Sequence, residues 1–382
     1  MGTARALRCS SFMKIAQIAP LIESVPPRFY GGTERVVSYL TEELVRLGHD
    51  VTLFASGDSV TSARLVSSAT TALRLDPKVL DPIPYLMLML DRVRECADNF
   101  DILHFHIDQF HFPLFRPLAG RTLTTVHGRQ DLPDLRPLYL GFNEMPLVSI
   151  SAGQRAPIPN ANFVATVYHG LPVDLHRPNF NPRGGYLAFL GRIAPEKGVD
   201  RAIKVARTLG IPLKIAAKVD RVDEAYFREQ IAPLLKEPGV EFVGEINERE
   251  KTDFLGQAVA LMFLIDWPEP FGLSMIEAMA CGTPVLALRR GSVGEVVEDN
   301  LTGRIVDSID EATMTLPDFM RLDRRAVRRR FEERFTATRM AKDYLRVYTS
   351  LLAQNVKLVP SLAETLRTTP AELADEPSES IN

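Results

Sequence analysis

The chain has 382 residues, of which 46% are hydrophobic and 24% are charged, and its formal net charge is −3. This composition is typical of a globular protein with room for two domains, and the charge gives no sign of a nucleic-acid-binding protein. No apolar stretch approaches the roughly 20 residues that a membrane-spanning helix needs. Three scattered cysteines, Cys9, Cys96 and Cys281, predict neither a disulfide framework nor a zinc site. We therefore expect a reducing, cytoplasmic setting.

Short apolar strands alternate with longer helices through the first part of the chain. Strands are predicted at Lys14–Pro20 and Asp50–Ser56, with a helix from Thr33 to Leu47 between them. Another helix is expected at Pro84–Ala97, and further strands at Ile102–His106, Thr122–His127, Leu147–Ser151 and Phe163–Tyr168. This order predicts a doubly wound α/β unit.

A segment rich in proline, asparagine and glycine, Leu171–Gly185, is the best candidate for a domain linker. The pattern then restarts, with strands predicted at Tyr186–Leu190, Leu213–Lys218, Val240–Val243, Ala260–Asp266 and Val285–Leu288, and helices at Gly198–Leu209, Asp223–Lys236, Glu248–Gly256 and Gly272–Cys281. Two Rossmann-like units joined by one linker predict a cleft between them, which is a preferred place for ligands.

Two carboxylates, Glu269 and Glu277, flank the start of a predicted helix. Glu269 follows a buried strand, where the ligands of βαβ units bind, and Glu277 lies one turn inside the helix. The free backbone N–H groups at the helix start attract anions. This arrangement suits a ligand with hydroxyls at both ends and phosphates in the middle, such as a nucleotide sugar. The alternative is that Glu277 is only a first-turn acid favoured by the helix dipole.

Two cations, Arg192 and Lys197, follow the first strand of the second unit. A loop at the carboxyl end of a strand can direct both into the cleft, where they would stabilise a departing diphosphate. Taken in isolation, such a pair is more often a solvated surface feature. The basic run Arg321–Arg334 is interpreted as a solvated helix face or, less favourably, as a patch for an anionic partner. Because no convincing Asp-x-Asp motif is present, we expect an enzyme that needs neither metal nor cofactor.

A glycine pair, Gly31 and Gly32, lies between the first strand and its helix, which Thr33 could cap. The turn lacks both a G-x-G-x-x-G fingerprint and a P-loop, so it is either a phosphate- or acceptor-binding turn or an ordinary βα turn. His104 and His106 could form a metal pair. Because no third ligand has a convincing spacing, packing at the strand end or contact with an acceptor is favoured.

These motifs together resemble the family 4 retaining glycosyltransferases (glycosyl transferases group 1), which have the GT-B fold. The matching features are the two-carboxylate spacing, the Gly-Gly-x-Glu-Arg run at 31–35 and the Gly-Arg…Glu-Lys-Gly loop at 191–198. The resemblance runs from about Lys14 to Asp307. It implies an α/β protein of two Rossmann-like domains facing across a cleft, and transfer of a hexose-type sugar from a nucleoside-diphosphate sugar to an acceptor hydroxyl with retained configuration.

The resemblance also implies roles for individual residues. Arg192 and Lys197 would stabilise the leaving diphosphate, and His127 would orient the donor. Glu269 would hold the transferred sugar and Glu277 the ribose. The remaining donor-binding positions are Gly31, Gly32, Glu245, Ile246, Phe271, Gly272 and Leu273. Lys218 stands where relatives often have a glycine-rich turn, which leaves the shape of the base pocket open.

The same resemblance divides the chain into an acceptor-side domain at 13–172, a nucleotide-sugar domain at 173–335 and a helix at 336–356 that crosses back. A tail at 357–382 is predicted to be disordered, and Met1–Phe12 is a poor signal peptide. The expected partners are the donor and a small-molecule, glycan or lipid-linked acceptor. The sequence leaves open peripheral contact with the inner face of a membrane, and it does not specify the nucleotide, the sugar or the acceptor.

Two other functions remain compatible with the sequence. One is a sugar-nucleotide 2-epimerase of the same fold, and the other is a non-catalytic module that binds a sugar nucleotide or a glycan. A glycan phosphorylase is less favoured because no pyridoxal-binding lysine is recognisable.

Overall fold

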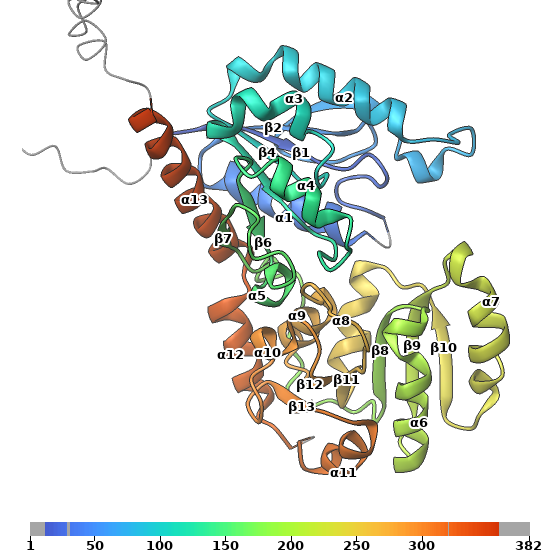
Figure 1. Cartoon of the computed structure of the whole chain (residues 1–382). Coiled ribbons are helices and arrows are strands. Elements are labelled where there is room, and N and C mark those ends of the chain that lie inside the picture. The colour runs from blue at the N-terminus through green and yellow to red at the C-terminus, as the bar shows by residue number, and fades with distance from the viewer. Residues whose placement is uncertain (1–11, 29–30, 320, 359–382) are drawn as a thin grey trace, which may run out of the picture.

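The computed structural model describes residues 12–28, 31–319 and 321–358. The segment 1–11, with Cys9, and the tail from residue 359 lie outside the described residues. Two parallel sheets, one for each half of the chain, form the framework (Figure 1). The protein is therefore an α/β protein of two Rossmann-like units, as the sequence predicts. None of the helices in the described ranges combines the length and apolar character required to cross a membrane.

The first sheet has seven strands in the order β3-β2-β1-β4-β5-β6-β7. The chain order reverses at β1, which pairs with β2 on one side and β4 on the other. Such a switch point places a ligand site at the carboxyl ends of the strands. The bounds are β1 Lys14–Ile18, β2 Asp50–Ser56, β3 Arg64–Ala69, β4 Ile102–Phe105, β5 Thr122–Thr125, β6 Leu147–Ser149 and β7 Phe163–Thr166.

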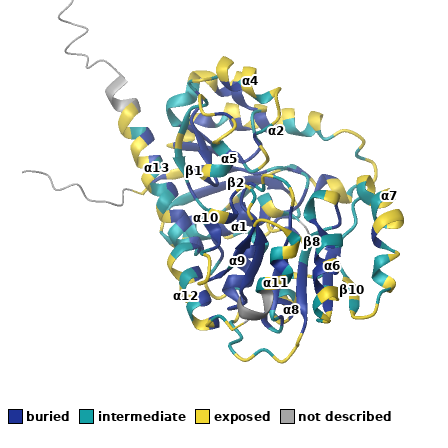
Figure 2. Cartoon of the chain, turned by 60° about the horizontal axis from the view of Figure 1, so that its bottom comes forward, coloured by how far each residue is buried: buried dark blue, intermediate teal, exposed yellow. Residues whose placement is uncertain are grey.

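The second sheet has six strands in the order β10-β9-β8-β11-β12-β13, and its order reverses at β8. In both sheets the central strands are buried on both faces, as Figure 2 shows in dark blue, because helices cover each side. The bounds are β8 Leu187–Arg192, β9 Leu213–Lys218, β10 Val240–Gly244, β11 Ala260–Phe263, β12 Val285–Leu288 and β13 Gly303–Val306.

The helices of the first unit are α1 Gly32–Arg46, α2 Ile83–Glu95, α3 Phe112–Phe115, α4 Leu135–Gly141 and α5 Ala152–Arg155, with short turns η1 Leu73–Leu75, η2 Ala97–Asn99 and η3 Arg116–Arg121. Those of the second are α6 Val199–Leu209, α7 Glu224–Tyr226, α8 Glu248–Gly256, α9 Leu273–Ala280, α10 Val293–Val296, α11 Ile309–Phe319 and α12 Arg324–Arg334, with turns η4 Pro195–Lys197, η5 Arg221–Asp223, η6 Phe227–Ile231 and η7 Leu234–Lys236. The last helix, α13 Ala337–Leu358, packs against α1 and η3 of the first unit (Figure 1).

Several elements differ from the sequence prediction, and two strands and one helix show why. The strands β3 and β13 were not expected, because β3 is a partly exposed edge strand with a mixed sequence and the short sequence of β13, Gly-Arg-Ile-Val, is not a continuous apolar run. The single helix predicted at Asp223–Lys236 is instead a series of short turns, one of them π-helical. Pro233 lies in that stretch, and a proline has no N–H with which to continue a helix.

The arginine-rich run was interpreted as a solvated helix face or as a patch for an anionic partner. Neither interpretation describes the arginines of α12 that are buried. Arg324 donates hydrogen bonds to the backbone carbonyls of Gly256 and Ala258, at the end of α8. Arg328 donates to the carbonyl of Ala280, the last residue of α9, at 2.6 Å. Carbonyls at helix ends have no partner within the helix, so these arginines satisfy them and fix both helices in place.

Candidate active site

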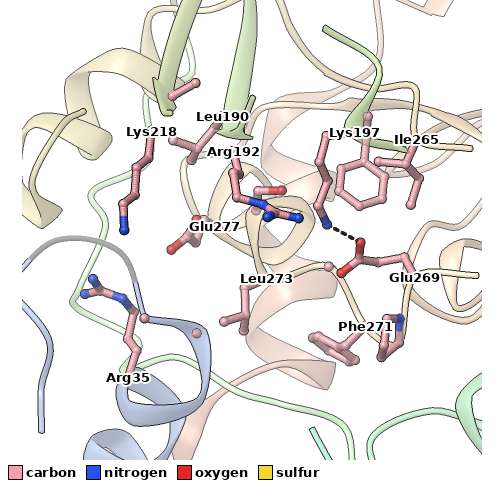
Figure 3. A pocket seen from close by; sticks show the side chains of 18 of the residues that line it. Arg35, Leu190, Arg192, Lys197, Lys218, Ile265, Glu269, Phe271, Leu273 and Glu277 are labelled. Carbon is pink, nitrogen blue, oxygen red and sulfur yellow. Dashed lines mark hydrogen bonds and ion pairs between the residues drawn. The ribbon is translucent and has the colours of Figure 1, made fainter. Parts of the chain in front are cut away.

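A cavity of about 430 Å³ lies between the two sheets, beside the carboxyl ends of their strands (Figure 3). Residues from both units line it. They include every site residue that the sequence predicts, namely Gly31, Gly32, His127, Arg192, Lys197, Glu245, Ile246, Glu269, Phe271, Gly272, Leu273 and Glu277. The structure therefore brings together all the positions for which the sequence predicts a role in the site, although the roles themselves stay predictions.

Two glycines hold the loop that carries Glu269. Gly272 has a φ of 80°, and a Cβ atom there would lie 2.7 Å from the ring of Phe263. Gly291 has a φ of 51°, and its Cβ would lie 2.3 Å from the carbonyl oxygen of Glu269. Both positions need the left-handed backbone that glycine adopts most readily, so the loop can pack tightly against β11 and the start of α10.

Glu269, Lys197 and Trp267 form one compact group in the cavity wall. The Lys197 Nζ lies 2.6 Å from Glu269 Oε2, which also accepts a hydrogen bond from Trp267 Nε1 at 2.7 Å. The same Nζ lies 4.9 Å from the centroid of the Trp267 ring, a cation–π distance. The predicted phosphate-binding cation is thus paired with the predicted sugar-binding carboxylate.

Arg192 is the last residue of β8, and carboxylates surround it. Its guanidinium lies 2.7 Å from Glu196, 3.0 Å from Asp223 and 3.8 Å from Asp220. In Figure 3 the guanidinium is directed toward Lys197 inside the pocket. These carboxylates hold the cation at the cavity wall, so that its position is set before any anion binds.

Glu277 belongs to a charge network that spans both units. Its Oε1 accepts a hydrogen bond from Lys251 Nζ at 2.7 Å, and that lysine also lies 3.5 Å from Glu248. Glu248 in turn forms an ion pair with Arg35 of α1, so the network crosses the cleft. Burial by itself would raise the pKa of Glu248, but contacts with His176, Lys251 and Arg35 lower it to about 2.

The same network contains a group of residues, among those described, with the spacing of metal ligands. His176, Glu248 and Glu277 each offer one possible ligand atom, and these three atoms lie within 4.8 Å of one another. Lys251 and Arg35 already neutralise the two carboxylates. A divalent ion would have to displace or approach both cations, so we interpret the group as an ion-pair network rather than a metal site.

Two helices begin at the cavity, and neither has a side-chain cap. Gly31 precedes α1 and Gly272 precedes α9, and among the residues that the structure describes neither capping position makes a side-chain hydrogen bond to its helix. The prediction that Thr33 caps α1 is therefore wrong, because Thr33 already lies inside the helix and Gly31 occupies the capping position. The first N–H groups of both helices stay available for an anion.

His127 lies two residues beyond β5, and one of its nitrogens is engaged. Its Nε2 lies 2.9 Å from Nδ1 of His106, and its ring stacks on that of His169, with 5.3 Å between centroids. Burial lowers the pKa of His127 to about 3, so the ring is neutral at physiological pH. His104 has hydrogen-bond partners at both nitrogens, Tyr348 and Thr125, and it does not form a metal pair with His106.

The cavity residues that were not predicted as site residues include Arg35, His169, Lys251 and Trp267. Arg35 lies within the recognised glycine motif, and Figure 3 shows it opposite Lys218 and Glu277. Trp267 is the only tryptophan of the chain and precedes Glu269 by two residues, which is a usable signal. Lys251 and His169 carry no such signal, because only the tertiary structure brings them to the cavity.

Each half of the chain matches a family model of glycosyltransferases. Residues 30–156 match Glycosyltransferase Family 4, and residues 174–332 match Glycosyl transferases group 1. The chain therefore belongs to the family 4 glycosyltransferases, as its motifs predict.

Individual relatives agree with this assignment. A lipopolysaccharide 1,2-N-acetylglucosaminetransferase of Salmonella typhimurium is 26% identical over 59% of this chain and 64% of its own length. Other curated relatives are matched over about half of their length or less. Sucrose-phosphate synthase from Thermosynechococcus elongatus has a TM-score of 0.72 at 19% identity, covering 90% of this chain and all of that one. Alr3699/HepE of Anabaena, solved with UDP and glucose, has a TM-score of 0.68 at 15% identity, covering 88% of this chain and all of that one. These structures share the GT-B fold.

The buried histidines predict how stability depends on pH. Burial lowers the pKa of His104, His106, His111, His127 and His169 below 6.5. The unfolded chain takes up protons below that pH and the folded protein does not, so acid favours unfolding. The free energy of unfolding should fall between pH 7 and 5.5, approaching about 1.4 kcal/mol per pH unit for each histidine. Urea titrations at several pH values measure this, and a stability that stays constant or rises would contradict it.

Proposed function

We propose that the protein is a retaining glycosyltransferase that moves a sugar from a nucleoside-diphosphate sugar to an acceptor hydroxyl without a divalent metal. The observation that carries this proposal is the charge arrangement of one cavity. Positive potential at its centre comes from Arg192, Lys197 and two uncapped helix starts. On either side, the carboxylates of Glu269 and Glu277 can accept hydrogen bonds from hydroxyl groups. A nucleotide sugar has the complementary order of a sugar, two phosphates and a ribose.

The proposed reaction follows from these positions. The bond between the anomeric carbon and the diphosphate oxygen breaks, and the acceptor oxygen forms a new bond on the same face of the sugar. The acceptor proton passes to the departing phosphate oxygen. Arg192 and Lys197 stabilise the charge that develops there, because fixed cations in a cavity act without reorganising. The two domains hold donor and acceptor in register, which lowers the entropic part of the barrier.

The ion pairs of the cavity support the metal-free form of the proposal. In many enzymes a divalent ion neutralises the diphosphate. Here Arg192, Lys197 and the N–H groups of the two helix starts would neutralise it instead. A cytoplasmic location is part of the proposal, since Cys96 and Cys281 are both free thiols. The acceptor is a small molecule, a glycan or a lipid-linked sugar, and only the last would require contact with the inner face of a membrane.

Release of nucleoside diphosphate from a panel of UDP-, GDP- and ADP-sugars tests the proposal. One donor should release its diphosphate faster with a suitable acceptor than alone, and activity should survive a chelator. Conversion of a donor alone into its 2-epimer would identify an epimerase, and binding with no release, even by slow hydrolysis, would identify a binding module. Loss of activity on chelation that Mg²⁺ or Mn²⁺ restores would contradict the metal-free reaction.

Lys197→Ala should lower kcat on the order of 100-fold and change donor binding much less. The reason is that the lysine acts on charge that appears only as the bond breaks. Steady-state kinetics and donor titration measure the two effects separately. Lys204→Ala, on an exposed face of α6, is the matched control. Equal losses in turnover and in donor affinity would argue against the role given to Lys197.

Glu277→Gln should chiefly raise the KM for the donor, by about 10-fold, because a weaker acceptor replaces the carboxylate that holds the ribose. The amide keeps the shape of the side chain and retains one acceptor for Lys251. A fall in kcat with an unchanged KM would mean that the ribose assignment is wrong. Melting temperature should be recorded alongside, since Glu277 is only 4% exposed and also anchors a lysine.

A further inference from the structure

A continuous chain of hydrogen bonds connects His127 in the cavity to the C-terminal helix. From His127 it runs through His106 to Gln17 of β1, where Gln17 Oε1 lies 2.7 Å from His106 Nε2. Gln17 Nε2 then donates to the hydroxyl of Tyr348 on α13 at 3.2 Å. The proposed transfer has no use for these groups beyond His127, although Gln17 and His106 are buried to 98% or more.

The series of hydrogen bonds continues past Tyr348 to a second tyrosine of the same helix. The Tyr348 hydroxyl lies 2.7 Å from Nδ1 of His104, whose Nε2 lies 2.8 Å from Thr125 Oγ1. Thr125 Oγ1 lies 2.8 Å from the hydroxyl of Tyr344. Each neutral imidazole in the chain has one N–H and one lone pair, so it donates on one side and accepts on the other.

The orientation of the Gln17 amide sets where the proton of His127 lies. Gln17 Oε1 is an acceptor only, so His106 carries its proton on Nε2 and presents a lone pair at Nδ1. His127 must then donate from Nε2 to that lone pair. This leaves Nδ1 of His127 unprotonated. Within the described residues that nitrogen has no protein partner, and the ring lines the cavity.

The Gln17 amide is the one member whose orientation decides between the two possible directions. Turned over, it would donate to His106, and every bond toward the cavity would reverse, so that His127 would present an N–H instead of a lone pair. Tyr348 engages the other end of the amide, and His104 engages Tyr348. In the orientation observed, the Tyr348 hydroxyl accepts the amide N–H of Gln17 and donates its own proton to Nδ1 of His104, so it supports this orientation from a helix that is remote in sequence.

We propose that Gln17 and Tyr348 are positioning residues that hold His127 with its proton on Nε2, so that Nδ1 accepts a hydrogen bond from a hydroxyl of the sugar donor. This inference rests on the proposed function for the identity of the ligand. The protonation pattern does not depend on it. The C-terminal helix thereby takes part in donor recognition without contacting the donor.

The protonation pattern is measured directly from the nitrogen chemical shifts of the histidine rings. The chain has seven histidines, and His127→Asn identifies the signals of His127 by their loss. The wild-type protein should show His127 protonated on Nε2. In Tyr348→Phe and Gln17→Met, which remove the hydroxyl and the amide, these signals should move toward a mixture of both tautomers. A wild-type proton on Nδ1, or a tautomer unchanged in both variants, would overturn the proposal.

Kinetics provides the second measurement. Tyr348→Phe should lower kcat/KM for the donor by about 10-fold, the effect of one weakened hydrogen bond. The control is Tyr186→Phe, which removes another buried tyrosine hydroxyl, bonded to the carbonyl of Phe254 in the second unit. It should lose similar stability with kcat/KM and His127 signals unchanged, and an equal loss of kcat/KM in this control would contradict a specific role. Because the nitrogen signals need no turnover, they test this inference even if no transferase activity is found.

Discussion

Positive charge confined between two parallel sheets is the constraint on which the rest of the structure depends. Two helices start at the cavity on glycines and leave their N–H groups uncapped, and Arg192 and Lys197 add full charges beside them. Concentrating cations in this way is unfavourable without anions nearby. The protein supplies its own, since Glu269 neutralises Lys197 and three carboxylates surround Arg192.

These internal ion pairs give the cavity a preformed shape. A side chain held by an ion pair has already lost much of its rotational freedom, so a ligand that takes over the contact has less ordering to supply. The ion-pair network from Arg35 to Glu277 likewise fixes side chains across the cleft. It connects α1 of the first unit to α8 and α9 of the second unit. The buried arginines of α12 complete this arrangement, because Arg328 fixes the end of the helix that carries Glu277.

The sequence predicted the parts of the site that are local in the chain. The segments 191–198 and 269–277 each place their charged residues at or beyond the end of a buried strand, and topology brings such strand ends to one edge. What it did not predict depends on contacts between distant segments. Lys251 meets Glu277 only through the packing of α8 on α9, and the bond between Gln17 and Tyr348 spans 331 positions. The edge strand β3 was missed for a related reason, because it lacks the continuous apolar sequence of the buried strands.

A structure of the protein with a bound nucleotide sugar tests the central claim most directly. The account predicts that the diphosphate lies between the first turns of α1 and α9, within hydrogen-bond distance of Arg192 and Lys197. The ribose should contact Glu277 and the sugar should contact Glu269. A nucleotide seated elsewhere, or one whose phosphates contact neither cation, would contradict it.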